Sequence, residues 1–243
     1  MRLKAVVAYD GTDYHGFQRQ SPDREPSIQG TLEQALSAIG QAGAVIGAGR
    51  TDAGVHASGQ VIAFDVDWRH GLDDLQRALN AVLPLSIAVL ELEQTTERFH
   101  PRYDAVSREY RYSVLNRRVR DPLALRYALH VPQPLDGAAM QQALIALEGE
   151  HDFAAFGQPT VGESTIRSVY RARLDAQADR ITIDLQANGF LYRMVRRIVG
   201  TLLMVGRGEL SPADFTAILE AADPASAGPA VAPGGLCLTK VNY

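Results

Sequence analysis

Apolar side chains recur along the chain at two spacings, and each spacing predicts one kind of element. Short apolar runs and strict alternation predict β-strands, which we expect at residues 3–9, 44–48, 60–65, 86–92, 108–115, 166–177, 181–187 and 236–241. Apolar residues three and four positions apart predict helices at residues 27–39, 72–82, 136–147, 190–205 and 212–221. Strands and helices are mixed in both halves, so the pattern predicts an α+β fold.

A polar stretch at residues 95–105, which contains Pro101, interrupts this pattern. We place a domain boundary there, between a first half at residues 1–100 and a second half at residues 101–243. Residues 10–19 and 156–163 combine glycine with polar side chains and are expected to be loops.

The composition is that of an ordinary globular protein. Of the 243 residues, 46% are hydrophobic and 21% are charged, which excludes a disordered chain. No apolar run approaches the roughly 20 residues that a membrane-spanning helix needs. The first residues pass directly into a predicted strand, without the apolar segment of a signal peptide. We therefore expect a cytoplasmic protein with no membrane partner.

Cysteine content and charge narrow the function classes further. One cysteine, Cys237, is present, which excludes a disulfide framework within the chain and a cysteine-rich metal site. The formal net charge of −4 argues against nucleic-acid binding, because phosphate recognition uses positive potential. The middle of the chain is nevertheless locally basic, since residues 98–126 contain eight arginines and three acidic residues.

Two predicted strands enclose a glycine-rich loop with the sequence Gly49-Arg50-Thr51-Asp52-Ala53-Gly54-Val55-His56-Ala57. Small neighbours let the backbone turn and let a large partner approach Asp52 closely. Arg50, two residues away, could keep that carboxylate ionised and nucleophilic. The pattern equally fits a structural turn in which Asp52 caps the backbone and His56 lies at the surface. A metal site at Asp52 and His56 is disfavoured, because no third ligand follows at a recognisable spacing.

This loop resembles, residue for residue, the active-site motif of the TruA family of tRNA pseudouridine synthases. Further segments resemble other motifs of that family in the same order. They are residues 9–20 (YDGTDYHGFQRQ), 97–102 (ERFHPR), 108–112 (REYRY) and 194–200 (MVRRIVG). The resemblance thus extends along nearly the whole chain.

The resemblance implies a fold and a partner. The fold would be the α+β pseudouridine synthase fold, in which two α/β halves form a continuous mixed or antiparallel sheet with a central catalytic cleft. The enzyme would be a homodimer that binds the anticodon stem and loop of tRNA and isomerises uridine to pseudouridine at positions 38, 39 and 40. Isomerisation needs neither redox chemistry nor external group transfer, so no cofactor and no metal are expected.

The resemblance also assigns roles to four residues. Asp52 would be the catalytic nucleophile, and Arg196 would pair with its carboxylate. Tyr110 would lie against the target base and could remove the proton from C5. Arg50 would bind the substrate and help to extrude the target nucleotide from its stack.

Periodicity by itself gives plainer roles to the same side chains. Tyr110 and Tyr112 lie on the same face of a predicted strand. Tyrosines at such positions are usually packing residues whose hydroxyls are hydrogen-bonded. Arg193, Arg196 and Arg197 gather on one side of the predicted helix at 190–205, where a solvated face is the usual explanation. The resemblance singles out Tyr110 and Arg196, and we assign Tyr112 to the core. Because Arg197 directly follows Arg196, the arginine that pairs with the carboxylate could also be Arg197.

Two other functions fit parts of the sequence. One is a noncatalytic protein that binds or folds tRNA on the same scaffold, and the other is an unrelated hydrolase that depends on an aspartate. The presence of Asp52, Tyr110 and Arg196 disfavours the first, and the ordered motifs disfavour the second. The sequence does not distinguish attack of Asp52 at C1′ from attack at C6 or from elimination to a glycal.

Overall fold

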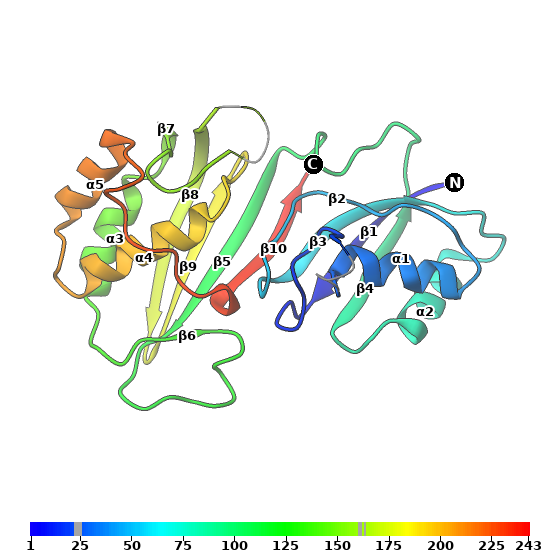
Figure 1. Cartoon of the computed structure of the whole chain (residues 1–243), viewed down its shortest axis with the longest axis horizontal. Helices are drawn as coiled ribbons and strands as arrows, with labels where there is room; N and C mark the ends of the chain where they lie inside the picture. Colours follow the sequence, from blue (N-terminus) through cyan, green and yellow to red (C-terminus); the bar gives the residue numbers. More distant parts are fainter. Residues whose placement is uncertain (22–25, 160–161, 163) are drawn as a thin grey trace. The chain divides into compact units, whose positions relative to one another are not determined.

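The computed structural model describes residues 1–21, 26–159, 162 and 164–243, and α and β elements are mixed throughout this part of the chain (Figure 1). The α+β class predicted from the sequence is confirmed. Of the predicted loop at 156–163, residues 160, 161 and 163 lie outside the described residues. No helix in the described ranges is both long and apolar enough to span a bilayer.

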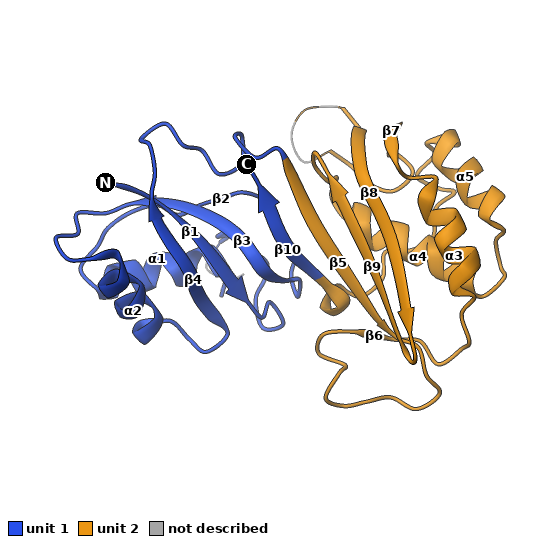
Figure 2. Cartoon of the chain, turned by 180° about the vertical axis from the view of Figure 1, so that it is seen from behind, with its two compact units in different colours: residues 1–106, 237–243 blue, residues 107–236 orange. Residues whose placement is uncertain are grey.

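The chain divides into two units, coloured separately in Figure 2. The first unit contains Met1–Val106 and Cys237–Tyr243, and the second contains Ser107–Leu236. The sequence-based division at residues 100 and 101 falls six residues earlier and leaves the C-terminal strand in the second half. The difference arises because that strand pairs with a strand near the start of the chain, through Cys237 opposite His56.

The sheet of the first unit has the order β4-β1-β3-β10. Its strands are β1 (Arg2–Tyr9), β3 (His56–Asp65), β4 (Ile87–Gln94) and β10 (Leu236–Asn242), and the short β2 (Ile46–Gly47) pairs with β3. Neighbours are antiparallel except β3 and β10, which are parallel. Buried and partly exposed residues alternate along β1, so one face of this strand lies in the core.

Helices α1 (Ile28–Ala38) and α2 (Leu72–Val82) contact each other in the first unit. α1 begins where the Ser27 hydroxyl accepts a hydrogen bond from the Gly30 amide. α2 packs against β4, where the Asn80 side chain bonds both the amide and the carbonyl of Val89. The helices predicted from apolar spacing at residues 27–39 and 72–82 are therefore confirmed.

The sheet of the second unit is built from antiparallel strands in the order β5-β9-β8-β7. They are β5 (Ser107–Leu115), β9 (Arg180–Ala187), β8 (Ile166–Gln177) and β7 (Gly149–Asp152), and β6 (Leu129–His130) runs parallel to β5. The hairpin between β8 and β9 turns at Ala178, whose φ is 51°. This is the hairpin that the sequence predicts.

The described part of the second unit contains three α-helices, which are α3 (Gly137–Ile145), α4 (Met194–Gly206) and α5 (Pro212–Ala221), and a 3-10 helix at Pro233–Gly235. α3 contacts β8, α4 and α5. The apolar stripe expected on α4 is buried, including Met194, Ile198 and Leu202 at 0% exposure. α4 begins four residues later than predicted, because Arg193 takes the left-handed conformation with φ at 60°. The short strands β6 and β7 were not predicted.

Candidate active site

The loop that carries Asp52 connects β2 to β3 in the first unit. Asp52 is partly exposed, whereas its neighbour Thr51 is only 6% exposed. The Val55 amide donates to the Asp52 carbonyl over 3.1 Å and closes a turn immediately before β3. The loop therefore presents a carboxylate at the end of a buried strand.

Buried side chains of β1 and β3 hold this loop through hydrogen bonds. The hydroxyls of Tyr9 and Thr51 are hydrogen-bonded over 2.8 Å. The Gln60 amide nitrogen donates to the Gly49 carbonyl over 2.9 Å and to the Tyr9 hydroxyl over 3.4 Å. Burial raises the pKa of Tyr9, so this phenol stays neutral and serves as a structural donor and acceptor.

The connection that follows β1 holds the same loop from another side. The Phe17 amide donates to the Thr51 carbonyl over 3.0 Å, and the Gly54 amide donates to the Tyr14 carbonyl over 3.3 Å. Gly11 must be a glycine here, because a Cβ on it would lie 2.0 Å from the Val55 carbonyl oxygen. The connection thus fixes the backbone of the loop on each side of Asp52, at Thr51 and at Gly54.

His56 is buried, which contradicts the interpretation of this residue as a surface histidine. Its Nδ1 accepts a hydrogen bond from the Gly11 amide over 3.0 Å and lies 3.2 Å from a carboxylate oxygen of Asp10. In the part of the chain that the structure describes, no cluster of three or more His, Cys, Asp or Glu side chains could hold a metal ion. His56 therefore fastens the 10–17 connection to β3.

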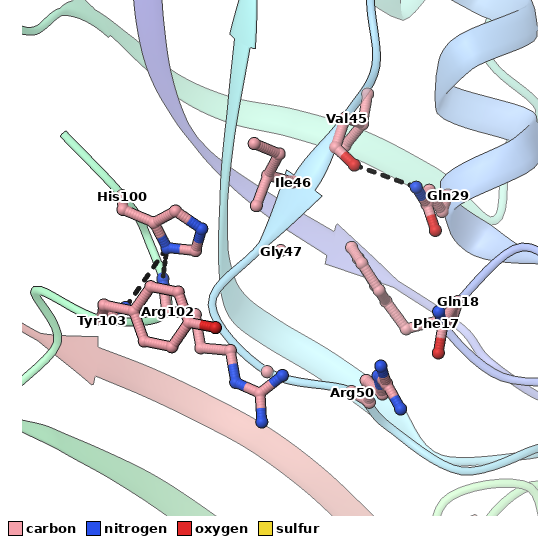
Figure 3. A pocket seen from close by; sticks show the side chains of 11 residues that line it. Phe17, Gln18, Gln29, Val45, Ile46, Gly47, Arg50, His100, Arg102 and Tyr103 are labelled. Carbon is pink, nitrogen blue, oxygen red and sulfur yellow. Dashed lines mark hydrogen bonds between the residues drawn. The ribbon is translucent and has the colours of Figure 1, made fainter. Parts of the chain in front are cut away.

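Arg50 is exposed and borders a hollow in the first unit (Figure 3). The hollow also contacts Phe17, His100, Arg102 and Tyr103, and Asp52 is not among the residues that line it. Two residues of the ERFHPR segment, His100 and Arg102, thus border the same cavity as Arg50 of the loop.

Tyr110 lies on β5 in the second unit, opposite Leu185 of β9. It is partly buried, and its ring meets the Phe190 ring edge-on, with centroids 5.0 Å apart. Tyr112 is fully buried and donates to the Ala232 carbonyl over 2.7 Å, and burial raises its pKa. The assignment of Tyr112 to the core is confirmed.

Arg196 lies on α4 and is partly buried. Its Nε donates to the Val231 carbonyl over 2.7 Å, and the Val231 amide donates to the Arg196 carbonyl over 3.2 Å. Arg197 donates to the carbonyls of Pro224 and Ala227. The three arginines therefore have different surroundings, since the exposed Arg193 stacks on Tyr192 at 4.8 Å. The expectation that all three arginines lie on a solvated face is therefore wrong for Arg196 and Arg197, which bond backbone carbonyls.

The structure thus places the candidate residues in two groups. Arg50 and Asp52 share one loop of the first unit. Tyr110 and Arg196 belong to the second unit, where α4 contacts β5. Arg196 of α4 donates to the Val231 carbonyl, and Tyr112 of β5 donates to the Ala232 carbonyl, so both elements are bonded to the same segment. Sequence reasoning missed the supporting residues Tyr9, Gln60 and Phe190. Gln60 carried a usable signal, because it is a polar residue inside an apolar strand.

Comparisons with known proteins relate the chain to one family. A family model described as tRNA pseudouridine synthase matches residues 5–104 and 143–243. The tRNA pseudouridine synthase A of Brevibacillus brevis is 46% identical over 244 residues, which cover 100% of this chain and 99% of that protein. The protein of the same description from Moorella thermoacetica is 43% identical, with 99% of both chains covered.

A solved structure, that of the archaeal box H/ACA sRNP Nop10-Cbf5 complex, is a more distant match. It is 12% identical with a TM-score of 0.38, and the match covers 83% of this chain and 54% of that chain.

Proposed function

This chain belongs to the family of tRNA pseudouridine synthases, isomerases that convert uridine in tRNA to pseudouridine, and from that membership we propose its target and catalytic residues. We propose that the enzyme acts on uridines at positions 38, 39 and 40 of the anticodon stem and loop. Asp52 is the proposed nucleophile.

The observation that carries this proposal is the support of Asp52 by a fixed loop. A partly exposed carboxylate lies beside a buried threonine whose hydroxyl is bonded to Tyr9. Backbone bonds from Phe17 and Gly54 fix the chain on both sides of it. A nucleophile held in this way meets its electrophile without first having to be ordered.

The reaction is an isomerisation, so every atom of the base is retained. The glycosidic bond from N1 to C1′ breaks, the base turns, and a bond forms between C5 and C1′. C5 then loses a proton, and N1 gains one. A carboxylate suits this sequence because it forms and releases a covalent adduct with an electrophilic carbon, which divides one difficult step into easier ones.

We assign supporting roles to two residues of the second unit. In this proposal Tyr110 stacks against the target base and receives the C5 proton, and its edge contact with Phe190 supports the position of the ring. Arg196 pairs with the Asp52 carboxylate and keeps it ionised. Support for Arg196 comes from the bond between its Nε and Val231, which orients a planar guanidinium.

The experiment that tests the function is tritium release from tRNA labelled at uridine C5, because C5 must lose its hydrogen when it becomes the glycosidic carbon. We expect release by the wild type and none by Asp52→Asn, with tRNA binding retained by both. Asp73→Asn is the matched control, since it removes an exposed carboxylate from α2 in the same unit.

Two outcomes would contradict the proposal. Tritium release by Asp52→Asn at the wild-type rate would show that Asp52 is not the nucleophile. Binding of tRNA without tritium release by the wild type would indicate a noncatalytic tRNA-binding protein. Transcripts with a single uridine at position 38, 39 or 40 locate the target. Release only from uridines elsewhere in the tRNA would overturn the proposed target.

Arg50 is proposed to assist extrusion of the target nucleotide, which costs a few kcal/mol when the base is stacked. Its exposure beside Asp52 supports this role. Arg50→Ala should therefore slow conversion of stem uridines more than conversion of uridines that are already unstacked. Equal losses on both kinds of substrate would refute the extrusion role.

Arg196 and Arg197 offer a test of which arginine serves the reaction. Arg196→Lys keeps the charge and loses the planar fork, so we expect kcat to fall at least about tenfold. Arg197→Lys should change kcat by less than about threefold, because Arg197 binds backbone carbonyls of residues 224 and 227. Equal losses of kcat in steady-state assays would contradict this assignment.

We also propose that two copies of the chain bind one tRNA and that the enzyme is cytoplasmic and needs no cofactor. The proposal rests on family membership. Light scattering with and without tRNA should give two protein chains per RNA, and a complex of one chain with one tRNA would refute the dimer.

A further inference from the structure

The hollow beside the 49–55 loop has a volume of about 260 Å³ (Figure 3). Its walls come from residues 45–47, the nearby Phe17 and Gln18, the side chain of Gln29, and the turn at residues 100–103. Pockets for drug-sized ligands usually measure about 300–1,000 Å³. A space of this size suits one small unit of a polymer, such as a single nucleotide.

The charge around this hollow is positive. Arg50 and Arg102 line it, and none of the eleven lining residues is Asp or Glu. Of two neighbouring carboxylates that do not line the hollow, Glu33 forms an ion pair with Arg19 at 2.8 Å, and Asp104 accepts a bond from the His100 amide. Guanidinium groups bind phosphate oxygens in a planar fork, so the cavity favours an anionic ligand.

Tyr103 brings an exposed aromatic ring to the same cavity. It is 75% exposed, yet its backbone is fixed, because the Nδ1 of His100 accepts bonds from the amides of Arg102 and Tyr103 at 3.2 and 3.3 Å. The His100 and Tyr103 rings lie 4.3 Å apart at an angle of 33°, and the Arg102 guanidinium lies 5.9 Å from the Tyr103 ring. A fixed, exposed ring next to arginine is how proteins stack unpaired bases.

The position of the hollow in the chain relates it to the catalytic loop. Arg50 lines the hollow, and Asp52 is only two residues further along. Two residues of extended chain span at most about 7 Å, so the backbone at Arg50, which borders the hollow, lies within about 7 Å of the backbone that carries Asp52. An occupant of the hollow is therefore a near neighbour of the target.

We infer that this hollow binds the nucleotide adjacent to the target uridine in the tRNA strand. Tyr103 stacks on its base, Ile46 provides apolar contact, and Arg102 and Arg50 bind its phosphate. The inference rests on the proposed function, because it takes Asp52 as the position of the target.

Two changes made together, one in the protein and one in the RNA, test the stacking. tRNA transcripts with an abasic residue on the 5′ or the 3′ side of the target are bound by the wild type and by Tyr103→Leu, and Kd is measured by fluorescence anisotropy. On one side, loss of the base should weaken wild-type binding about tenfold, the scale of one stacked base. The same loss should change Kd for Tyr103→Leu by less than about twofold.

Matched controls separate stacking from folding. Tyr170→Leu truncates a tyrosine of the second unit that is 53% exposed, and it should respond to the abasic residue as the wild type does. Tyr103→Leu should also keep the wild-type melting temperature, because the ring is mostly exposed. An equal loss of affinity in the wild type and in Tyr103→Leu would overturn the inference.

Salt dependence tests the phosphate contact. Arg102→Gln should reduce the slope of log Kd against log salt concentration by roughly 0.7–0.9, the share of one phosphate contact. Arg69→Gln, an exposed arginine of the same unit outside the hollow, should leave the slope unchanged. An unchanged slope for Arg102→Gln would remove the phosphate contact from the inference.

Failure of the proposed function is recognised separately. Tritium release by the wild type tests the function without reference to the hollow. Normal release together with the absence of coupling at Tyr103 would refute the binding pocket alone.

Discussion

Tyr9 is a buried residue whose hydroxyl is bonded to Thr51, the neighbour of the partly exposed Asp52. Its oxygen is shared between Thr51 and Gln60, and Gln60 also bonds the Gly49 carbonyl. One phenol thus joins β1, β3 and the loop that carries Asp52. We therefore propose that Tyr9 is a positioning residue.

Tyr9→Phe should lower the free energy of unfolding by about 1–3 kcal/mol, because the buried Thr51 hydroxyl loses its partner. It should also lower kcat more than it raises KM, since Asp52 is less well aimed. Tyr243→Phe is the control, because it removes a hydroxyl bonded to the Pro101 carbonyl in the same unit. Urea unfolding measures the loss of stability and steady-state kinetics measure kcat and KM, and equal kcat for the two variants would contradict the positioning role.

At the scale of residues, the candidate residues could be selected from the sequence, but the side chains that support them could not. Asp52 and Arg50 could be selected because they stand in a short local motif. Tyr9 and Thr51 are separated by 42 residues, and their bond depends on the pairing of β1 with β3, which residue types do not reveal. His56 was open to a surface interpretation because nothing local indicated that Gly11 bonds its ring.

At the scale of elements, α4 and the segment after α5 approach each other very closely. A Cβ on Gly200 would lie 1.9 Å from the Pro229 carbonyl oxygen, so α4 can carry only glycine there. The same segment continues to Val231, which bonds Arg196. Packing at Gly200 therefore sets the position of Arg196.

Gly200→Ala should destabilise the protein by about 1–3 kcal/mol or more, because the added methyl forces two backbones apart. It should also reduce kcat, since Val231 moves with the displaced segment. Gly137→Ala in α3 meets only ordinary contacts at 3.5 Å and should be neutral or slightly stabilising. Denaturant unfolding compares the two, and equal stabilities would contradict the close-packing argument.

α5 begins with a capping box that depends on pH. Asp214 accepts hydrogen bonds from the Ser211 amide and hydroxyl, at 2.8 and 2.7 Å, and these bonds lower the pKa of Asp214. A carboxyl whose folded pKa is lowered stabilises the protein above its unfolded pKa, and this contribution is lost as pH falls through the folded value.

Asp214→Asn should therefore weaken the dependence of stability on pH below about pH 4, near the unfolded pKa of an aspartate. The variant should have a lower melting temperature than the wild type at pH 7, and the difference should shrink on acidification. Thermal unfolding at a series of pH values measures this, and a difference that is constant with pH would show that the box is not the cause.

Element types were predictable where apolar spacing is regular, as in α2 and β1. Boundaries depended on features that the pattern does not contain. The left-handed backbone of Arg193 delays α4, although the apolar spacing continues back to Leu191. β6 has two residues and β7 has four, too few for alternation to be visible.

At the scale of the molecule, the last strand belongs to the unit that contains the first. β10 pairs in parallel with β3, and the Asn242 carbonyl accepts a bond from the Val106 amide. Tyr243 packs on Phe99 with ring centroids 5.1 Å apart and lies 4.8 Å from the Lys4 ammonium. The sequence predicted a strand there but not its partner, because partner choice depends on distant residues.

Deletion of residues 237–243 should therefore disturb the first unit although it shortens the far end of the chain. Amide hydrogen exchange should speed up in β3 and in residues 99–106, while amides of β8 in the second unit stay protected. Mass spectrometry of the exchanged peptides measures this, and faster exchange confined to the second unit would contradict it.

The return of β10 to the first unit also affects the order of events during synthesis. A ribosome adds about 5–20 residues each second, so the start of β3, at His56 and Ala57, is made roughly ten seconds or more before β10, which pairs with it. During that interval the nascent first unit presents an open edge, which is a site for wrong pairing with other chains. We expect this protein to depend on chaperones during translation more than a protein whose first domain is contiguous.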